Sequence, residues 1–332
     1  MPLPTFTNSV ALRSHWHVVA ETNDVVSGPL AVTLLGEKIV VWRDSEGSLV
    51  AAPDRCPHRE APLSAGVVED GCLSCVYHGW VFGVGGRCVD VPSSGEGVPV
   101  PPRAHLAVVA AAERYGLVWL CLGEPAAPIP EMTADTDRSF RRINSGVAIW
   151  KAAATRMVDN FLDVSHFPYV HSGTFGGAQE PLVPPIELVA LDDGYHGYRY
   201  EVVANNPDEA QATSGSADAV VERTMTTGFC LPLAVRSTIT YKSGLQHVIL
   251  LLSSPIDEST SYFTFVVWRN DDFDVPGEEV IRFDRAIGEE DRKMLEQLSG
   301  GLPLERTALT SVQSDRASVE WRRRLAALME KS

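Results

Sequence analysis

The sequence lacks the segments that would place a protein in a membrane or send it out of the cell. No apolar run reaches about 18 residues, so no transmembrane helix is expected. The start, Met1-Pro2-Leu3-Pro4, has no charged region followed by an apolar one, so no signal peptide is expected. The 6 cysteines are too few for a disulfide scaffold and are expected to be thiols or metal ligands. We therefore expect a cytoplasmic protein.

Positive charge is also scarce. The 28 lysines and arginines stand against 43 aspartates and glutamates, a net charge of −15, which argues against nucleic acids and anionic membranes as partners. No G-x-G-x-x-G motif follows a predicted strand, so no nucleotide-binding segment is expected either. With 45% apolar and 21% charged residues, the composition is that of an ordinary globular protein, long enough for two domains.

Short segments rich in β-forming residues alternate with turn signals over residues 15–122. Gly28-Pro29 and Gly36-Glu37 are examples of these turns. The predicted strands are 16–20, 31–35, 39–42, 49–52, 73–76, 80–82, 88–91 and 117–121. This pattern predicts a small all-β domain.

A stretch rich in proline and alanine, 123–131, ends this series of strands and marks a domain boundary. Beyond it, helices are predicted at about 151–167, 277–298 and 314–330, and strands at 198–203, 234–241, 246–252 and 261–268. This order predicts an antiparallel sheet covered by helices, an α+β fold. We therefore expect one domain at 1–125, a linker at 126–145 and a second domain at 146–332.

Cysteine and histidine occur as two mixed pairs in the first domain. Cys56 and His58 form a C-x-H pair, and Cys75 and His78 form a C-x-x-H pair further along. Structural zinc also takes two cysteines and two histidines, but it usually places both cysteines in one pair and both histidines in the other. A [2Fe–2S] cluster with two cysteines on one iron and two histidines on the other needs this ligand set. The spacing therefore favours the cluster over a zinc site.

A second candidate site lies in the stretch 160–171, where Asp163 precedes His166 by three residues and His171 follows it by five. Two imidazoles and a carboxylate around open positions are the ligand set of non-haem Fe(II) oxygenases. On a helix, Asp163 and His166 would share one face. Pro168 should then bend or end the helix and turn His171 back toward His166. The alternative is a solvated helix face that happens to carry a histidine.

A third ligand is predicted on the helix at 277–298. Asp291 falls in the middle of an apolar stripe that consists of Val280, Ile287, Met294 and Leu298. A carboxylate that faces the core is costly unless it is paired or bound to a metal. The alternative is an acid that reaches the surface at the edge of the helix. The neighbouring Glu289 and Glu290 are expected to project to the side or away.

The motifs at 56–64 and 75–80 resemble the Rieske domain of the Rieske non-haem iron oxygenases. The order Asp163, His166, His171 and then a distant Asp291 is similar to the catalytic domain of the same family. The chain looks most like the vanillate and dicamba O-demethylase group, and the resemblance covers nearly its whole length. Glu60 is a small departure, because the family usually has glycine at this position.

The resemblance implies a helix-grip (START-like) catalytic domain and two metal centres. Their ligands would be Cys56, His58, Cys75 and His78 for a Rieske [2Fe–2S] cluster, and His166, His171 and Asp291 for a mononuclear Fe(II). It further implies that Asn160 lies beside the iron ligands. Asp163 would bridge a cluster histidine of one subunit and an iron histidine of the next in a head-to-tail homotrimer.

The function implied is that of a terminal oxygenase that hydroxylates, or oxidatively O- or N-demethylates, a small aromatic or cyclic compound with O₂. Its electrons would come from NAD(P)H through a separate reductase, directly or by way of a ferredoxin. Two alternatives are a dioxygenase that cis-dihydroxylates aromatic rings and, more distantly, a non-enzymatic Rieske electron carrier. A mostly apolar substrate pocket is expected, with the lining residues Met157, Phe161, Phe175, Val266 and Trp268.

Overall fold

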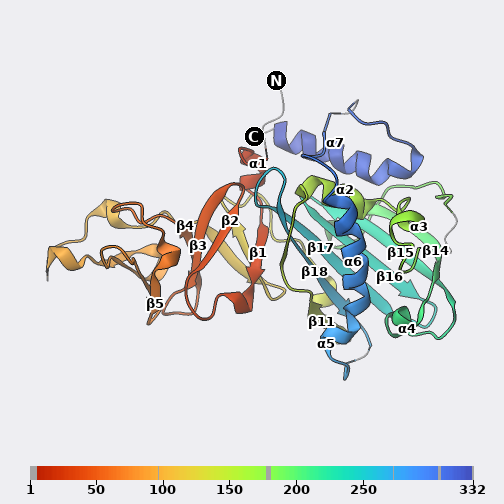
Figure 1. The fold of residues 1–332 in the computed structure, drawn as a ribbon, viewed down its shortest axis with the longest axis horizontal. Helices are drawn as coiled ribbons and strands as arrows, with labels where there is room; N and C mark the ends of the chain where they lie inside the picture. The colour runs from red at the N-terminus through yellow and green to blue at the C-terminus, as the bar shows by residue number, and fades with distance from the viewer. Residues whose placement is uncertain (1–5, 96, 177–180, 272, 306–307, 331–332) are drawn as a thin grey trace. The chain divides into compact units, whose positions relative to one another are not determined.

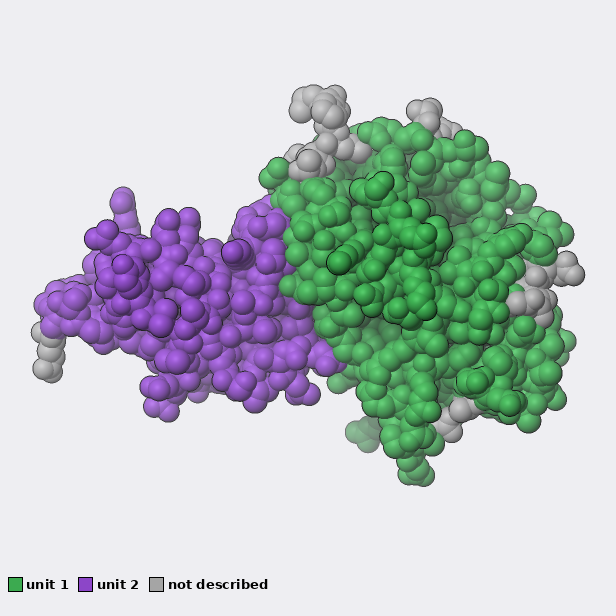
Figure 2. All heavy atoms as spheres, viewed as in Figure 1, with its two compact units in different colours: residues 1–11, 129–332 green, residues 12–128 purple. Residues whose placement is uncertain are grey.

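The computed structural model describes residues 6–95, 97–176, 181–271, 273–305 and 308–330 (Figure 1). The chain forms two compact units, one of residues 12–128 and one of residues 1–11 with 129–332 (Figure 2). A short helix, α1 (Val10–Arg13), lies where the two units meet in sequence. None of the helices in the described ranges is long and apolar enough to cross a membrane.

The unit of residues 12–128 is built from three small antiparallel sheets. The first has the order β1 (His17–Glu21), β10 (Leu117–Cys121), β9 (Ala110–Arg114); the second β2 (Leu30–Leu34), β3 (Glu37–Arg43), β4 (Leu49–Pro53); the third β5 (Val67–Glu69), β6 (Cys72–Ser74), β7 (Val81–Phe82), β8 (Cys88–Asp90). Trp42, Leu73 and Phe82 belong to one buried core cluster, which therefore joins the second sheet to the third. The expected all-β domain is confirmed.

The second unit is organised by one large antiparallel sheet, and its elements follow in chain order. The strands are β11 (Arg141–Asn144), β12 (Ala148–Trp150), β13 (Val189–Ala190), β14 (His196–Asn205), β15 (Val220–Cys230), β16 (Ala234–Tyr241), β17 (Gln246–Pro255) and β18 (Ser261–Arg269). The helices are α2 (Ala154–Leu162), α3 (Phe167–Val170), α4 (Asp208–Ser214), α5 (Gly277–Val280), α6 (Arg282–Leu295) and α7 (Arg316–Glu330). The expected α+β architecture is confirmed.

Helices α2 and α6 cross one face of this sheet (Figure 1). Met157 of α2, Phe263 of β18 and Leu295 of α6 belong to one buried cluster, which holds the helices on the strands. The apolar stripe predicted for 277–298 is confirmed at Val280, but Met294 is 40% exposed, and the next residue, Leu295, is buried instead. The same stripe leaves Asp291 buried.

Candidate metal centres

The two Cys/His pairs lie on two loops with the same backbone path. Cys56 N–H donates to Ala61 O at 2.8 Å, and Cys75 N–H donates to Trp80 O at 2.8 Å. Each cysteine carbonyl accepts from the N–H four residues later, at 2.9 Å in both loops. Glu60 and Gly79 hold these equivalent fourth positions with φ of 58° and 71°. Glutamate therefore replaces glycine in a left-handed turn without changing the loop.

The four side chains of these loops fit a cluster with different ligands on its two irons. The Cys56 thiol contacts the Cys75 thiol, and burial together with this contact raises the pKa of Cys56 to about 11. The rings of His58 and His78 also lie together, with centroids 4.3 Å apart. In the described part of the chain His58 Nδ1 is buried and has no hydrogen-bond partner. A metal ion would satisfy this ring nitrogen, since buried polar atoms are normally paired.

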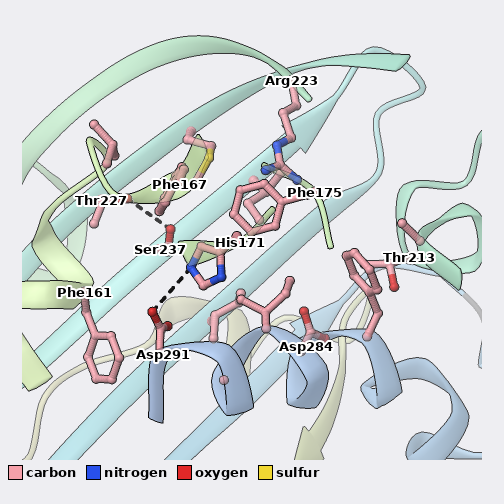
Figure 3. A pocket seen from close by; sticks show the side chains of 18 of the residues that line it. Phe161, Phe167, His171, Phe175, Thr213, Arg223, Thr227, Ser237, Asp284 and Asp291 are labelled. Atoms are coloured by element: carbon pink, nitrogen blue, oxygen red, sulfur yellow. Dashed lines mark hydrogen bonds and ion pairs between the residues drawn. The ribbon is translucent and has the colours of Figure 1, made fainter. Parts of the chain in front are cut away.

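A pocket lies in the second unit between the sheet and helices α2 and α6 (Figure 3). It encloses about 1060 Å³ of empty space, its open mouth included. The apolar side chains in its lining include Phe161, Phe175, Met225, Ile249, Leu251 and Phe263. Its polar lining includes His171 and Asp291, the hydrogen-bonded hydroxyl groups of Thr227 and Ser237, and the charged side chains of Arg223 and Asp284 (Figure 3).

Three of the five expected lining residues do not line this pocket. Met157 is buried in the core cluster between α2 and β18. Val266 and Trp268 lie on the opposite face of β18 from Phe263 and Phe265, because side chains of a strand alternate with period two. These three residues therefore lie outside this pocket, whereas Phe161 and Phe175 line it.

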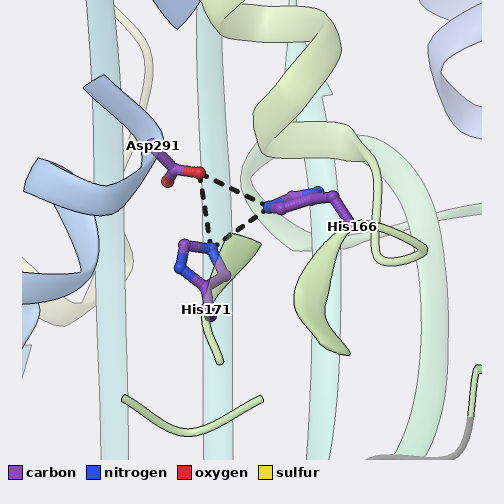
Figure 4. A group of neighbouring side chains, drawn as sticks. All are labelled: His166, His171 and Asp291. Carbon is purple, nitrogen blue, oxygen red and sulfur yellow. Dashed lines mark hydrogen bonds and ion pairs between the residues drawn. The ribbon is translucent and has the colours of Figure 1, made fainter. Parts of the chain in front are cut away.

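His166, His171 and Asp291 converge at one end of the pocket (Figure 4). The two Nε2 atoms are 3.2 Å apart, and Asp291 Oδ1 lies 3.5 Å from the first and 3.4 Å from the second. His171 is 1% exposed and Asp291 7%. Among the described residues, His166, His171 and Asp291 form the one group of three His, Cys, Asp or Glu side chains whose ligand atoms lie close enough to share a metal ion.

The reason for the approach of Asp163 to His166 differs from the expected one. Helix α2 ends at Leu162 rather than near Pro168, and Asp163 has extended dihedrals (φ −87°, ψ 146°). Its carboxylate accepts hydrogen bonds from Ser165 N–H at 2.9 Å and from His166 N–H at 3.1 Å, which stabilises a tight turn. The two side chains therefore meet across this turn and not along a helix face.

The hydrogen bonds of the outer ring nitrogens determine which atoms of the histidines face inward. His166 Nδ1 lies 3.0 Å from Asp163 Oδ2, and His171 Nδ1 lies 3.0 Å from Glu290 Oε2. Carboxylates only accept, so both Nδ1 atoms carry a proton, and each Nε2 faces Asp291 as the atom that would bind a metal. Two nitrogens and one oxygen that converge in this way fit a divalent metal cation.

The charges of the site agree with this arrangement. Burial acts to lower the pKa of His166, but its hydrogen bonds with Asp163 and Asp291 outweigh burial and raise the pKa to about 9. Burial acts to raise the pKa of Asp163, yet the hydrogen bonds from His166 and Ser165 hold it below the usual value. The pKa of Asp291 is likewise lowered by the two histidines against the effect of burial. The acids around the two imidazoles therefore favour positive charge here, which a bound metal ion would supply in place of a proton on His166.

Two neighbours orient the ligand atoms. Asn160 Nδ2 of α2 donates to Asp291 Oδ1 at 2.9 Å, which places Asn160 beside the three converging side chains. Glu290 accepts from Thr174 Oγ1 at 2.7 Å in addition to His171. The expectation that Glu290 projects away was wrong, because the chain after His171 passes along α6 closely enough for Gly173 to pack against this carboxylate. In the sequence, the position of Glu290 next to Asp291 is the feature that could have indicated this contact.

Removal of the Glu290 carboxylate is expected to weaken metal binding at His171. Glu290→Ala should lower metal retention about 10- to 100-fold, because the ring loses the partner that fixes its tautomer and orientation. Glu290→Gln should cost less, since its amide oxygen still accepts. The measurement is a chelator titration of the metal bound at this site, with Glu289→Ala as the control, since Glu289 contacts Arg292 instead. Equal retention in Glu290→Ala and the control would contradict this role.

Comparisons with known families match almost the whole chain. A model of the Rieske [2Fe–2S] domain matches residues 15–108. A model of the vanillate O-demethylase oxygenase C-terminal domain matches residues 150–331. The first match contains both Cys/His loops, and the second contains the site at His166, His171 and Asp291.

Single proteins are similar over the same length. Methylxanthine N1-demethylase NdmA of Pseudomonas putida is 31% identical over 96% of this chain and 90% of its own. TsaM2, a putative toluene-4-sulfonate monooxygenase system iron-sulfur subunit of Comamonas testosteroni, is 31% identical over 86% of this chain and 87% of its own. The solved structure of Pseudomonas putida CBB5 NdmA with caffeine superposes with a TM-score of 0.82 at 29% identity, covering 96% of this chain and 92% of that one.

Proposed function

Since this chain belongs to the Rieske non-haem iron oxygenases with a C-terminal domain of the vanillate O-demethylase type, we propose that it hydroxylates or oxidatively demethylates a small cyclic compound. It is the oxygenase component of a multicomponent system, so a separate reductase supplies its electrons. The expected resemblance to the O-demethylase group is confirmed by the family match. The ring system and the position attacked belong to the proposal.

The observation that carries the proposal is the convergence of His166, His171 and Asp291 at the end of a mostly apolar pocket. A mononuclear Fe(II) held there would supply O₂ activation with electrons from the [2Fe–2S] cluster. His166, His171 and Asp291 would hold the ion at the end of the pocket. A ring bound against Phe161 and Phe263 would therefore place a carbon near these three side chains.

The surrounding residues prepare this geometry and do not react themselves. Asn160 holds the Asp291 carboxylate, and Glu290 and Asp163 hold the two imidazoles with their lone pairs inward. The apolar lining binds the flat face of a ring and excludes water from the reacting carbon.

The delivery of electrons is proposed to involve a neighbouring subunit. The Asp163 carboxylate already accepts the His166 Nδ1 proton, and its side chain is only partly buried. In the proposed head-to-tail trimer it would also accept from a cluster histidine of the next subunit. A reductase, directly or through a ferredoxin, would reduce that cluster.

Gly288 gives this pocket part of its width. It lies in the interior of α6 and lines the pocket, and a Cβ built there meets only Phe263 Cε1, at 3.9 Å. Glycine inside a helix costs about 1 kcal/mol relative to alanine. Gly288→Ala should therefore raise the melting temperature by about 2–4 °C and raise KM for the bulkiest substrate several-fold. Thermal melts and steady-state kinetics test both effects; a lower melting temperature or an unchanged KM would contradict them.

Product analysis tests the proposed reaction. The purified protein, with a surrogate NADH-dependent reductase, is offered methoxy-aromatic acids, N-methyl heterocycles and unsubstituted rings under ¹⁸O₂. The proposal predicts either formaldehyde equal to the demethylated product or a single labelled hydroxyl group. A cis-diol carrying two labelled oxygens, or NADH oxidation without a product from any compound, would overturn it.

A further inference from the structure

The pocket has a second polar end that the iron site does not use. Arg223 of β15, which lies over the Phe175 ring, and Asp284 of α6 both line it (Figure 3). Asp284 precedes Asp291 by seven residues, so the two carboxylates share one face of α6, about 10 Å apart along its axis. Gly288 lies between them and leaves this wall open. A substrate of about two fused rings would reach from one end to the other.

Two polar atoms at this end are buried and make no hydrogen bond. In the described part of the chain, Arg223 Nε and Asp284 Oδ2 are both inaccessible to solvent and make no hydrogen bond. The Arg223 guanidinium lies 4.9 Å from the centre of the Phe175 ring. Buried charged groups are normally paired, and an unmade hydrogen bond there is costly. These atoms therefore indicate a missing ligand.

The neighbouring cation, Arg269, already has its partners. Arg269 donates to both Asp271 oxygens at 2.7 Å and to His247 Nδ1 at 3.2 Å. Because a guanidinium only donates, His247 carries its proton on Nε2, which lies 3.4 Å from Asp284 Oδ1. Burial lowers the pKa of His247, so its ring is neutral. One cation, Arg223, and one acid, Asp284, remain for the ligand.

The acid can serve as an acceptor, and its charge decides which ligands fit. Burial raises the pKa of Asp284 to about 7, so a ligand that donates a hydrogen bond favours its ionised form. A ligand carboxylate at Arg223 would instead place a second negative charge beside it. A neutral group that accepts a hydrogen bond from Arg223 and donates one to Asp284 satisfies both side chains.

We propose that Arg223 and Asp284 select a neutral substrate with an amide-type edge, such as a lactam, cyclic urea or imide. Its carbonyl oxygen accepts from the Arg223 guanidinium, and its adjacent N–H donates to Asp284. The ring lies along Gly288 and presents its far side to the iron ligands. This inference rests on the proposed function, since it takes the pocket to be the substrate site.

Three two-ring probes test this selection by calorimetric titration of the holoenzyme without reductase. They are 2-quinolone, which has the N–H and C=O edge, 1-methyl-2-quinolone, which lacks the N–H, and 2-naphthoate, which is an anion. We expect 2-quinolone to bind at least about tenfold more tightly than either of the others. Tighter or equal binding of 2-naphthoate, or no binding of any probe, would overturn the inference.

Two variants assign the selection to these residues. Asp284→Asn should weaken 2-quinolone binding about tenfold and strengthen 2-naphthoate binding, because it removes the repelling charge. Arg223→Gln should weaken both. Arg199→Gln is the matched control, an exposed arginine on the adjacent strand β14. Unchanged affinities in both pocket variants would overturn the inference. Because binding needs no turnover, a failed proposed function would appear separately, as missing iron or missing product.

Discussion

Asp163→Asn is expected to leave both metal centres loaded and to lower turnover about 100-fold or more. The carboxylate accepts four hydrogen bonds, two from Ser165 and two from His166, and an amide can accept only at its oxygen. The amide oxygen can still accept from the His166 ring, so the metal stays bound, but the amide offers no second accepting oxygen to a cluster histidine of a neighbouring subunit. Turnover is measured with saturating reductase, and iron and sulfide are assayed on the same samples.

The control for this variant is Ser165→Ala. It removes one hydroxyl donor to Asp163 but keeps the carboxylate, so its turnover should stay close to that of the wild type. Stopped-flow oxidation of the reduced cluster, with substrate and O₂ present, separates slow electron transfer from loss of structure. Asp163→Asn should slow this oxidation while its two metal signals stay normal. Wild-type turnover in Asp163→Asn would refute the bridging role.

Asp291→Ala is expected to abolish oxygenation altogether by emptying the mononuclear site. The change removes the one carboxylate among the three converging ligands and leaves Asn160 Nδ2 without its acceptor. Two imidazoles alone bind Fe(II) too weakly to retain it through purification. The iron content should fall by about one atom per chain, and the cluster spectrum should not change.

Glu289→Ala is the matched control for Asp291→Ala, because it removes an acid on the exposed side of the same helix. It should keep its iron and its activity. If Asp291→Ala retained the same iron content as this control, Asp291 would not be a ligand. If it lost the cluster as well, the two centres would not be independent.

The cluster loops could be predicted from sequence because their information is local. Each pair, Cys56 with His58 and Cys75 with His78, lies within four residues, so one turn brings the pair together. The small effect of Glu60 on the loop could also be predicted, since a residue other than glycine can adopt a left-handed backbone conformation at a modest cost in energy. The approach of His166 to His171 was local too, but for a different reason, because the two residues flank the short helix α3.

The parts that could not be predicted depend on tertiary packing. Whether Glu290 or only Asp291 faces the histidines is decided by how the chain after His171 passes along α6. The sheet face of Val266 and Trp268 is decided by a register of one residue, which a strand buried on both faces does not encode. Strand β15 was not singled out, because Arg223 on its inward face interrupts the apolar pattern where the pocket needs a charge.

The most direct test of two different iron centres on this chain is a metal and sulfide analysis of the anaerobically purified wild-type protein. The account predicts about three iron atoms and about two acid-labile sulfides per chain, with no zinc. About two iron atoms with two sulfides would contradict a mononuclear centre at His166, His171 and Asp291. Zinc without labile sulfide would contradict both centres.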